Sequence, residues 1–305
     1  METSIILETI IKVVVVLAVF SALAGFTTYI ERKVLAFMQR RLGPTNVGPY
    51  GLLQIAADGI KLFTKEDFIP ANACKPIFKI APIITAATAF IAMSAVPFLP
   101  EFEMFGYTVR PIISDINVGV LFVLSVGAIG LYGPLLGGMS SANKWALLGG
   151  ARTAIQLLSY EVVSGLSLLA PLMMVGSLSL IDINNYQADG VFSWIVWSQP
   201  LAFILFTIAG FAETNRTPFD LLEHEAELVA GYATEYSGMR WGMFFIGEYA
   251  NLFTISFLIT LIFLGGFNDL WFIPGGLAIV LKVMFLIFVF LKALSKSWFV
   301  LLALS

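Results

Sequence analysis

The sequence predicts an all-α fold, a polytopic bundle of about seven transmembrane helices that forms a single membrane domain over residues 1–305. Three observations support this class. Hydrophobic residues make up 59% of the chain and charged residues 12%, and the mean hydropathy is +0.91, well above the range of soluble domains. Apolar stretches of spanning length recur along the chain. Lysine and arginine collect in alternate loops between these stretches.

The apolar stretches predict the spans in order. The first, residues 5–30, has no basic leader and no small-residue cleavage site, so we expect a membrane helix and not a signal peptide. Each of the others has at least the roughly 20 residues that a helix needs to cross a bilayer. They occupy residues 77–99, 116–138, 154–178, 192–212, 242–265 and 276–301.

The loop charges predict the orientation of these spans. Eight Lys and Arg residues lie in 31–79, two in 139–153 and two in 213–241, whereas the opposite loops hold one, Arg110. Because positively charged loops stay on the cytoplasmic side, we expect the N-terminus outside and the loops 31–76 and 213–241 inside. The membrane is expected to be a bacterial inner membrane, with a mitochondrial inner membrane or a thylakoid as the alternatives.

The first inside loop contains an amphipathic segment, residues 51–66. Gly43-Pro44 and Gly48-Pro49 mark turns before it. The pattern predicts a helix that lies flat on the membrane, either as an interfacial anchor or as the wall of a cavity. Its apolar face holds Leu52, Leu53, Ala56, Ile60 and Phe63, and its polar face holds Gln54, Asp58, Lys61 and Lys65.

Two patterns exclude other chemistry. The chain has one Cys, Cys74, and one His, His224, so it cannot by itself build an iron–sulfur cluster or a Cys/His zinc site. The glycines of GAIGLYG at 127–133 lie inside a predicted span, which favours helix packing through small residues over nucleotide binding. Any redox chemistry must therefore come from a partner.

Acidic residues concentrate in the stretch 213–240, which holds five Glu and one Asp against two Arg. Carboxylates beside or within a bilayer are costly, which favours a role in proton handling; a solvated face is the alternative. Pro218 disfavours a continuous helix there, and we expect a short helix after Asp220.

Glu161 and Glu248 lie inside predicted spans, where a functional role is expected. The alternative is a buried ion pair, for example with Arg152 or Lys282. Glu213 and Arg216 are expected to pair at the membrane edge, and Glu31 and Arg32 to act as interface anchors.

Three motifs together resemble one family. They are ERKVLAFMQRRLGPTNVGPYGLLQIAADGIKLFTKE at 31–66, KWALLGGARTAIQLLSYEV at 144–162, and GFAETNRTPFDLLEHEAELVAGYATEYSGMRWGMFFIGEYAN at 210–251. These segments are similar to the signatures of the H subunit of NADH-quinone oxidoreductase, the respiratory complex I subunit also called NADH dehydrogenase subunit 1. The resemblance covers residues 5–290. It implies a membrane-arm subunit that helps to form a quinone chamber and the start of a proton path.

The resemblance also implies roles for individual residues. The acidic proton and coupling path would run through Asp220, Glu223, Glu225 and Glu227 to Glu213, Glu161 and Glu248. The chamber entrance would be walled by the first span, the amphipathic helix and the sixth span. The chamber residues would be Arg32, Gln39, Arg41, Gln54, Asp58 and Phe219, with Arg216 holding the acidic cluster together.

The implied ligand is a quinone substrate, with FMN and iron–sulfur clusters held only by partner subunits. The implied partners are the hydrophilic iron–sulfur and quinone-site subunits, small membrane subunits, antiporter-like subunits and the lipid bilayer, with no nucleic acid. A membrane-bound hydrogenase subunit and a stand-alone proton-coupled transporter are the alternatives. The chain differs from the family pattern at Leu222 and His224, where Pro and Ala are usual, and an eighth family helix is not visible before Ser305.

Overall fold

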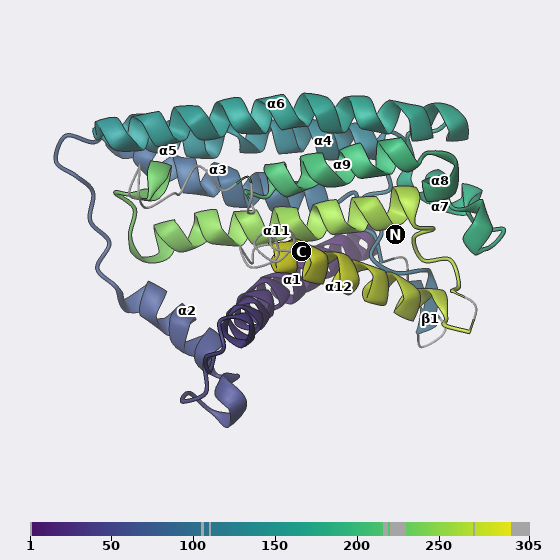
Figure 1. Cartoon of the computed structure of the whole chain (residues 1–305), viewed down its shortest axis with the longest axis horizontal. Coiled ribbons are helices and arrows are strands. Elements are labelled where there is room, and N and C mark those ends of the chain that lie inside the picture. Colours follow the sequence, from purple (N-terminus) through teal and green to yellow (C-terminus); the bar gives the residue numbers. More distant parts are fainter. Residues whose placement is uncertain are drawn as a thin grey trace, which may run out of the picture.

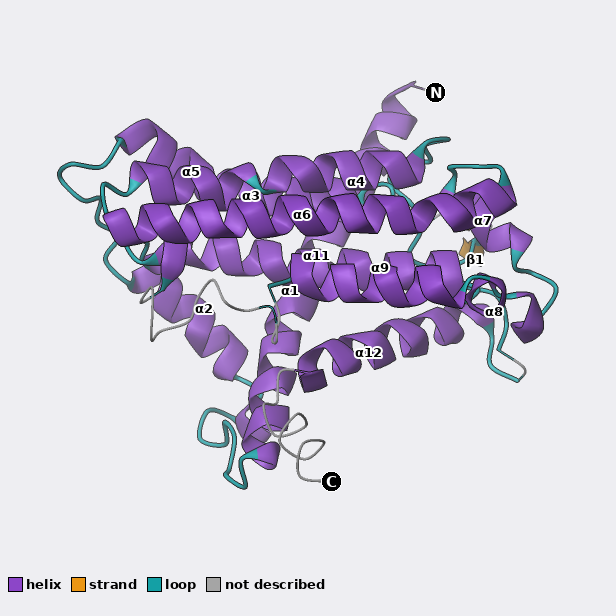
Figure 2. Ribbon diagram, turned by 45° about the horizontal axis from the view of Figure 1, so that its top comes forward, coloured by secondary structure: helices purple, strands orange, loops and turns teal. Residues whose placement is uncertain are grey.

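A computed structural model describes residues 2–104, 107–109, 111–215, 219, 230–270 and 272–293 of the chain. Long helices dominate these ranges (Figures 1 and 2), as the sequence predicted. The longer ones are α1 (Glu2–Met38), α3 (Lys75–Met93), α4 (Gly119–Gly130), α5 (Tyr132–Ser140), α6 (Lys144–Val175), α9 (Pro200–Glu213), α11 (Gly238–Phe263) and α12 (Gly275–Ala293). Shorter elements are α2 (Gln54–Thr64), α7 (Leu180–Tyr186), α8 (Ile195–Ser198), the turns η1 (Pro49–Gly51), η2 (Val191–Ser193) and η3 (Gly231–Ala233), and the antiparallel strands β1 (Phe102–Met104) and β2 (Tyr107–Val109).

Five helical stretches are long and apolar enough to cross a membrane, and α9 and α12 are shorter apolar helices. The five are residues 8–38, 75–93, 119–140, 144–175 and 238–263. They coincide with five of the expected spans, and α9 and α12 fall within the other two. The fold class, a polytopic helical membrane protein, is confirmed.

Helix α11 forms the centre of the bundle. It runs between α9 and the pair α1 and α12 in Figure 1, and it also packs along α3. Most of the residues in its span are buried inside the molecule, whereas few of those in the span of α1 are. Aromatic side chains fill the contacts around α11: Phe20 of α1 packs against Phe253 and Phe257 at centroid distances of 5.8 and 6.2 Å.

Two expected spans differ in detail from the helices observed. The span expected at 116–138 consists of α4 and α5, which meet at Leu131. The span expected at 192–212 contains η2 and α8 first, and the longer helix starts only at Pro200. The hydropathy pattern did not predict this break. Phe192, Trp194 and Trp197 are apolar, although the backbone at these residues does not form one continuous helix. Expected helix boundaries elsewhere are off by several residues, and α6 begins ten residues before the expected 154.

Two of the three glycines at 127–133, Gly130 and Gly133, serve helix packing, as predicted. A Cβ atom on Gly133 would lie 1.8 Å from Thr85 Oγ1 and 3.1 Å from the Ala81 carbonyl oxygen. A Cβ on Gly130 would lie 3.1 Å from Thr88 Oγ1. Helices α4 and α5 can therefore approach α3 this closely only with glycine at these positions.

The loops expected inside the cell lie together at one end of the bundle, which we call the basic end: residues 39–74, 141–143 and 231–237. Cys74 N–H donates to the Ser140 carbonyl at 3.0 Å. Asn143 Nδ2 donates to Glu235 Oε1 at 2.8 Å, and Arg240 pairs with Asp67 at 3.1 Å. In Figure 2, α2 lies at this end, and α7, α8 and β1 lie at the other.

The amphipathic segment folds as α2, and Gly48 (φ 73°) and Gly51 (φ 81°) shape the turn before it. Its polar side faces α1, where Arg32 pairs with Asp58. Ile60 and Phe63 on its apolar side are exposed at 65% and 74%, as expected for residues that meet lipid or a neighbouring subunit.

Candidate carboxylate cavity

Three carboxylates from three helices line one small cavity in the middle of the bundle. Glu161 comes from α6, Glu213 from the last turn of α9 and Glu248 from α11. The cavity has a volume of about 40 Å³. Since one water molecule needs roughly 10–15 Å³ measured in this way, the cavity has room for more than one. The structure thus brings together the three membrane-embedded members of the expected acidic path.

Close helix packing positions these carboxylates. A Cβ on Gly247, next to Glu248, would lie 2.9 Å from Thr85 Cγ2, so α11 meets α3 beside the cavity. A Cβ on Gly127 of α4 would make an ordinary contact of 3.6 Å with Glu213 Oε1, so α4 also lies against this carboxylate. Asn143 caps the N-terminus of helix α6, because its Oδ1 accepts a hydrogen bond from the Trp145 N–H at 2.9 Å.

Neutral polar side chains complete the cavity. The buried Tyr232 of η3 donates its hydroxyl to Glu248 Oε1 at 3.0 Å. Asn215 Oδ1 is buried and has no hydrogen-bond partner within the described part of the chain, and Asn251 also lines the space. A buried acceptor without a donor fits a water molecule or a protonated carboxyl group in the cavity. Of these three residues, only Asn251 could have been noticed from the sequence, because it is a polar residue inside an apolar stretch.

The segment after α9 is held against α6. Gln156 Nε2 donates to the Phe219 carbonyl at 2.9 Å, and the Phe219 ring packs edge-on against Tyr160 at 5.3 Å. Asn215, which lies in the sequence between the end of α9 and Phe219, adopts a left-handed backbone conformation with φ 50°. As Pro218 predicted, the helix ends before it, at Glu213.

Tyr236 supports η3 from the basic end. Its ring stacks on Phe78 at 4.0 Å, and its hydroxyl donates to the Phe78 carbonyl at 3.1 Å. Burial raises the pKa of Tyr236 to about 12, although the contact with Ser140 and the charge of Arg240 oppose the shift. The hydroxyl therefore stays a neutral donor at physiological pH.

Three of the expected chamber residues form one network between α1 and α2. Arg32 Nη1 donates to Asp58 Oδ2 at 2.5 Å, and Gln54 Nε2 donates to Asp58 Oδ1 at 3.1 Å. Arg41 Nε donates to Gln39 Oε1 at 2.6 Å just after α1 ends. Phe219, the remaining described member, lies against α6.

The other members of the expected sites lie outside the described residues. They are Arg216, Asp220, Glu223, Glu225 and Glu227, together with His224, Leu222 and the short helix expected after Asp220.

Two residues make contacts that the sequence did not suggest. Helix α1 continues to Met38, and Glu31 faces α11, where Tyr249 donates its hydroxyl to it. Lys282, one of the alternative partners for the buried carboxylates, makes no ion pair with them among the described residues. Its ammonium donates to the Gly266 carbonyl at 3.0 Å, because this part of α12 lies at the end opposite the basic end.

Comparison with known proteins gives one consistent result. The family model described as NADH dehydrogenase matches residues 11–298. A protein named as the H subunit of NADH-quinone oxidoreductase from Wolinella succinogenes is 77% identical over 289 residues, covering 95% of this chain and 88% of the relative. Proteins of the same name from Nitratiruptor sp. and Helicobacter hepaticus are 74% and 68% identical, covering 98% and 94% of this chain and 90% and 86% of the relatives. The chain therefore belongs to the family of NADH-quinone oxidoreductase H subunits.

Proposed function

We propose that the chain is a membrane subunit of a proton-pumping NADH-quinone oxidoreductase in which it forms part of the quinone chamber and carries the first part of the proton path. Its partners are the hydrophilic subunits that hold FMN and iron–sulfur clusters, small membrane subunits and antiporter-like subunits. This assignment fits a chain with a single Cys and a single His, which needs its electrons delivered by a partner.

The observation that carries this proposal is the cavity shared by Glu161, Glu213 and Glu248. Proton movement needs titratable groups joined by hydrogen bonds or water, and the cavity supplies both groups and space. Coulomb interaction between carboxylates in a site of low dielectric couples their protonation states. A charge change at one end of the path can thus alter proton occupancy further along it.

The contacts of α1, α2 and α11 support a chamber wall beside this cavity. A Cβ on Gly25 of α1 would lie 2.7 Å from Ile55 of α2, and one on Gly242 of α11 would lie 3.1 Å from Leu62. Helix α11 places Tyr249 against Glu31, the neighbour of Arg32, and Glu248 in the cavity. Helix α11 therefore connects the wall with the carboxylates, and an amphipathic wall suits a quinone with an apolar tail.

The proposed orientation has the N-terminus outside, the loops 31–76 and 213–241 inside, and the whole chain as one membrane domain in a bacterial inner membrane. The gathering of the basic loops at one end supports it, since all of them then face the same compartment. The three relatives from Wolinella, Nitratiruptor and Helicobacter are bacterial proteins.

The test of the proton path is Glu213→Gln in the assembled complex. We expect proton pumping and coupled quinone reduction to fall at least roughly tenfold, because the amide keeps the shape of the carboxyl group but cannot carry a proton. Pumping into sealed vesicles and quinone reductase activity are measured together.

Glu235→Gln is the matched control. Glu235 lies at the basic end outside the cavity, and an amide oxygen can still accept from Asn143. Unchanged pumping in both variants, with the complex assembled, would show that the cavity carboxylates are not on the path.

The chamber is tested by Asp58→Asn. The change removes the charge that pairs with Arg32 and holds α2 against α1, so we expect the KM for a short-chain quinone to rise about fivefold, as suits a partly exposed ion pair worth up to about 1 kcal/mol. Lys61→Gln, an exposed change on the same helix, should leave the KM unaltered. If the unaltered complex and the Asp58→Asn and Lys61→Gln variants have equal KM values, the network of Arg32, Gln54 and Asp58 is not part of the chamber wall.

A further inference from the structure

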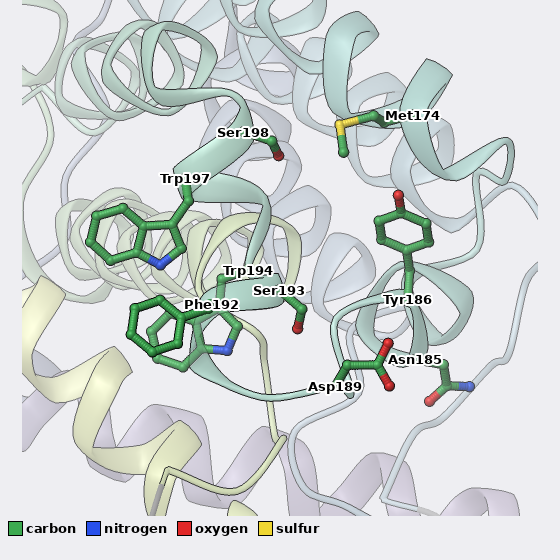
Figure 3. A pocket seen from close by; sticks show the side chains of 9 residues that line it. All are labelled: Met174, Asn185, Tyr186, Asp189, Phe192, Ser193, Trp194, Trp197 and Ser198. Atoms are coloured by element: carbon green, nitrogen blue, oxygen red, sulfur yellow. The ribbon is translucent and has the colours of Figure 1, made fainter.

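An open pocket lies at the end of the bundle opposite the basic end. It is separate from the carboxylate cavity. It is formed where α6 ends, along α7, η2 and α8, just before α9 begins (Figure 3). Its volume is about 740 Å³, within the roughly 300–1,000 Å³ of small-molecule sites. Neither the proton path nor the quinone chamber uses it.

The pocket is lined by aromatic rings and one carboxylate. Figure 3 shows Phe192, Trp194 and Trp197 on one side and Tyr186 and Asp189 on the other, with Ser193 between them. No lysine, arginine or histidine is among the residues that line it. Electron-rich ring faces together with a carboxylate form an environment that attracts an organic cation.

One of these rings, that of Trp194, already accepts a cation from outside the pocket. The ammonium of Lys282 lies 4.4 Å from the centroid of the Trp194 ring without lining the pocket itself. Trp197 is held in place by its own Nε1, which donates to the Val191 carbonyl at 3.0 Å, while 63% of the residue stays exposed. Trp197 therefore offers a fixed and accessible ring on the side of the pocket opposite the carboxylate.

The position of the pocket indicates an amphiphilic ligand. It lies between the last turn of one membrane helix and the first turn of the next, the depth at which lipid headgroups meet the hydrocarbon core. Exposed apolar side chains continue from it along both helices, with Met173 of α6 exposed at 82% and Leu201 of α9 at 68%. A headgroup in the pocket would leave its acyl chains on this apolar surface.

One uncharged donor suits the phosphate of such a headgroup. In Figure 3 the Tyr186 hydroxyl lies on the same side of the pocket as Asp189 and points toward Met174 of α6. A phosphodiester needs a donor, and a neutral donor binds it without attracting a lipid of higher negative charge, which Asp189 would repel.

We propose that this pocket binds the headgroup of a zwitterionic aminophospholipid, such as phosphatidylethanolamine. The ammonium lies between the rings and Asp189, the phosphate accepts a hydrogen bond from the Tyr186 hydroxyl, and the acyl chains follow α6 and α9. The proposal does not depend on the proton path.

The test uses the purified, assembled complex and phosphatidylethanolamine that carries a photoreactive group on one acyl chain. After illumination, labelled peptides are mapped by mass spectrometry. We expect label within residues 166–208, removed by unlabelled phosphatidylethanolamine and at least fivefold less well by phosphatidylglycerol with the same chains. Trp197→Leu and Asp189→Asn should each lower this labelling about fivefold, because each removes one attraction for the ammonium.

Phe272→Leu is the matched control, since Phe272 is 95% exposed but does not line the pocket, and its labelling should equal that of the unaltered complex. Quinone reductase activity confirms that each variant is assembled. The proposal is overturned by absence of label in this segment, by equal competition from the two lipids, or by unchanged labelling in both pocket variants.

Discussion

Gly149→Val is expected to prevent stable assembly of the complex. A Cβ atom on Gly149 would lie 2.7 Å from both the carbonyl carbon and the Cα of Gly231, and 2.8 Å from the Tyr232 nitrogen. All three are backbone atoms, so no change of rotamer relieves the clash. Overpacking of this kind costs about 1–3 kcal/mol even where side chains can adjust.

The expected defect reaches the carboxylate cavity, because η3 holds Tyr232 against Glu248. The amount of assembled complex is measured by native electrophoresis, and the pumping of any remaining complex per unit of quinone reductase activity. Gly165→Val is the control: it lies in the same helix, but a Cβ there meets nothing within 4 Å. If the two variants assemble equally well, the close contact between α6 and η3 has no energetic importance.

Gln187→Met is expected to cause the second largest loss of stability. The Gln187 side chain is completely buried at the end opposite the basic end. Its Oε1 accepts from the N–H groups of Ile195 and Gly265, each at 3.1 Å, and its Nε2 donates to the Leu261 carbonyl at 2.9 Å. Methionine has a similar size but leaves these backbone groups unpaired, and each buried, unpaired group costs about 1–3 kcal/mol.

The measurement is the midpoint temperature of thermal inactivation, together with the yield of assembled complex. Gln199→Met serves as the control, since the amide of Gln199 makes only a long contact of 3.9 Å with Met174 Sδ. The midpoint should fall clearly for Gln187→Met and little for Gln199→Met. Equal midpoints would mean that water replaces the lost hydrogen bonds and that Gln187 is not essential to this end of the bundle.

The carboxylates show how far sequence reasoning reached into the candidate site. Glu161 and Glu248 drew attention because charge inside an apolar span is costly, and Glu213 because it ends one. That reasoning could not foresee that the three share one cavity, since they come from helices far apart in the sequence. Tyr232 and Asn215 gave no signal, because a Tyr and an Asn in a loop are ordinary.

The contacts of Glu31 and Lys282 could not be predicted for a related reason. Charge and position in a span are properties of the sequence, but the partner of a side chain depends on the end of the bundle at which it lies and on the face it presents. Lys282 lies at the end opposite the basic end, and Glu31 faces α11, so each found a partner that the sequence did not suggest.

Sequence alone determined the membrane class, the approximate position of each span, the amphipathic helix and the family. It could do so because a bilayer demands long apolar helices whatever their neighbours are, and because long motifs are specific. Only the tertiary structure decided the break before α9, the gathering of the carboxylates around one cavity and the aromatic pocket at the far end. These depend on which faces of distant helices meet, and hydropathy, which measures length and polarity along the chain, does not record that.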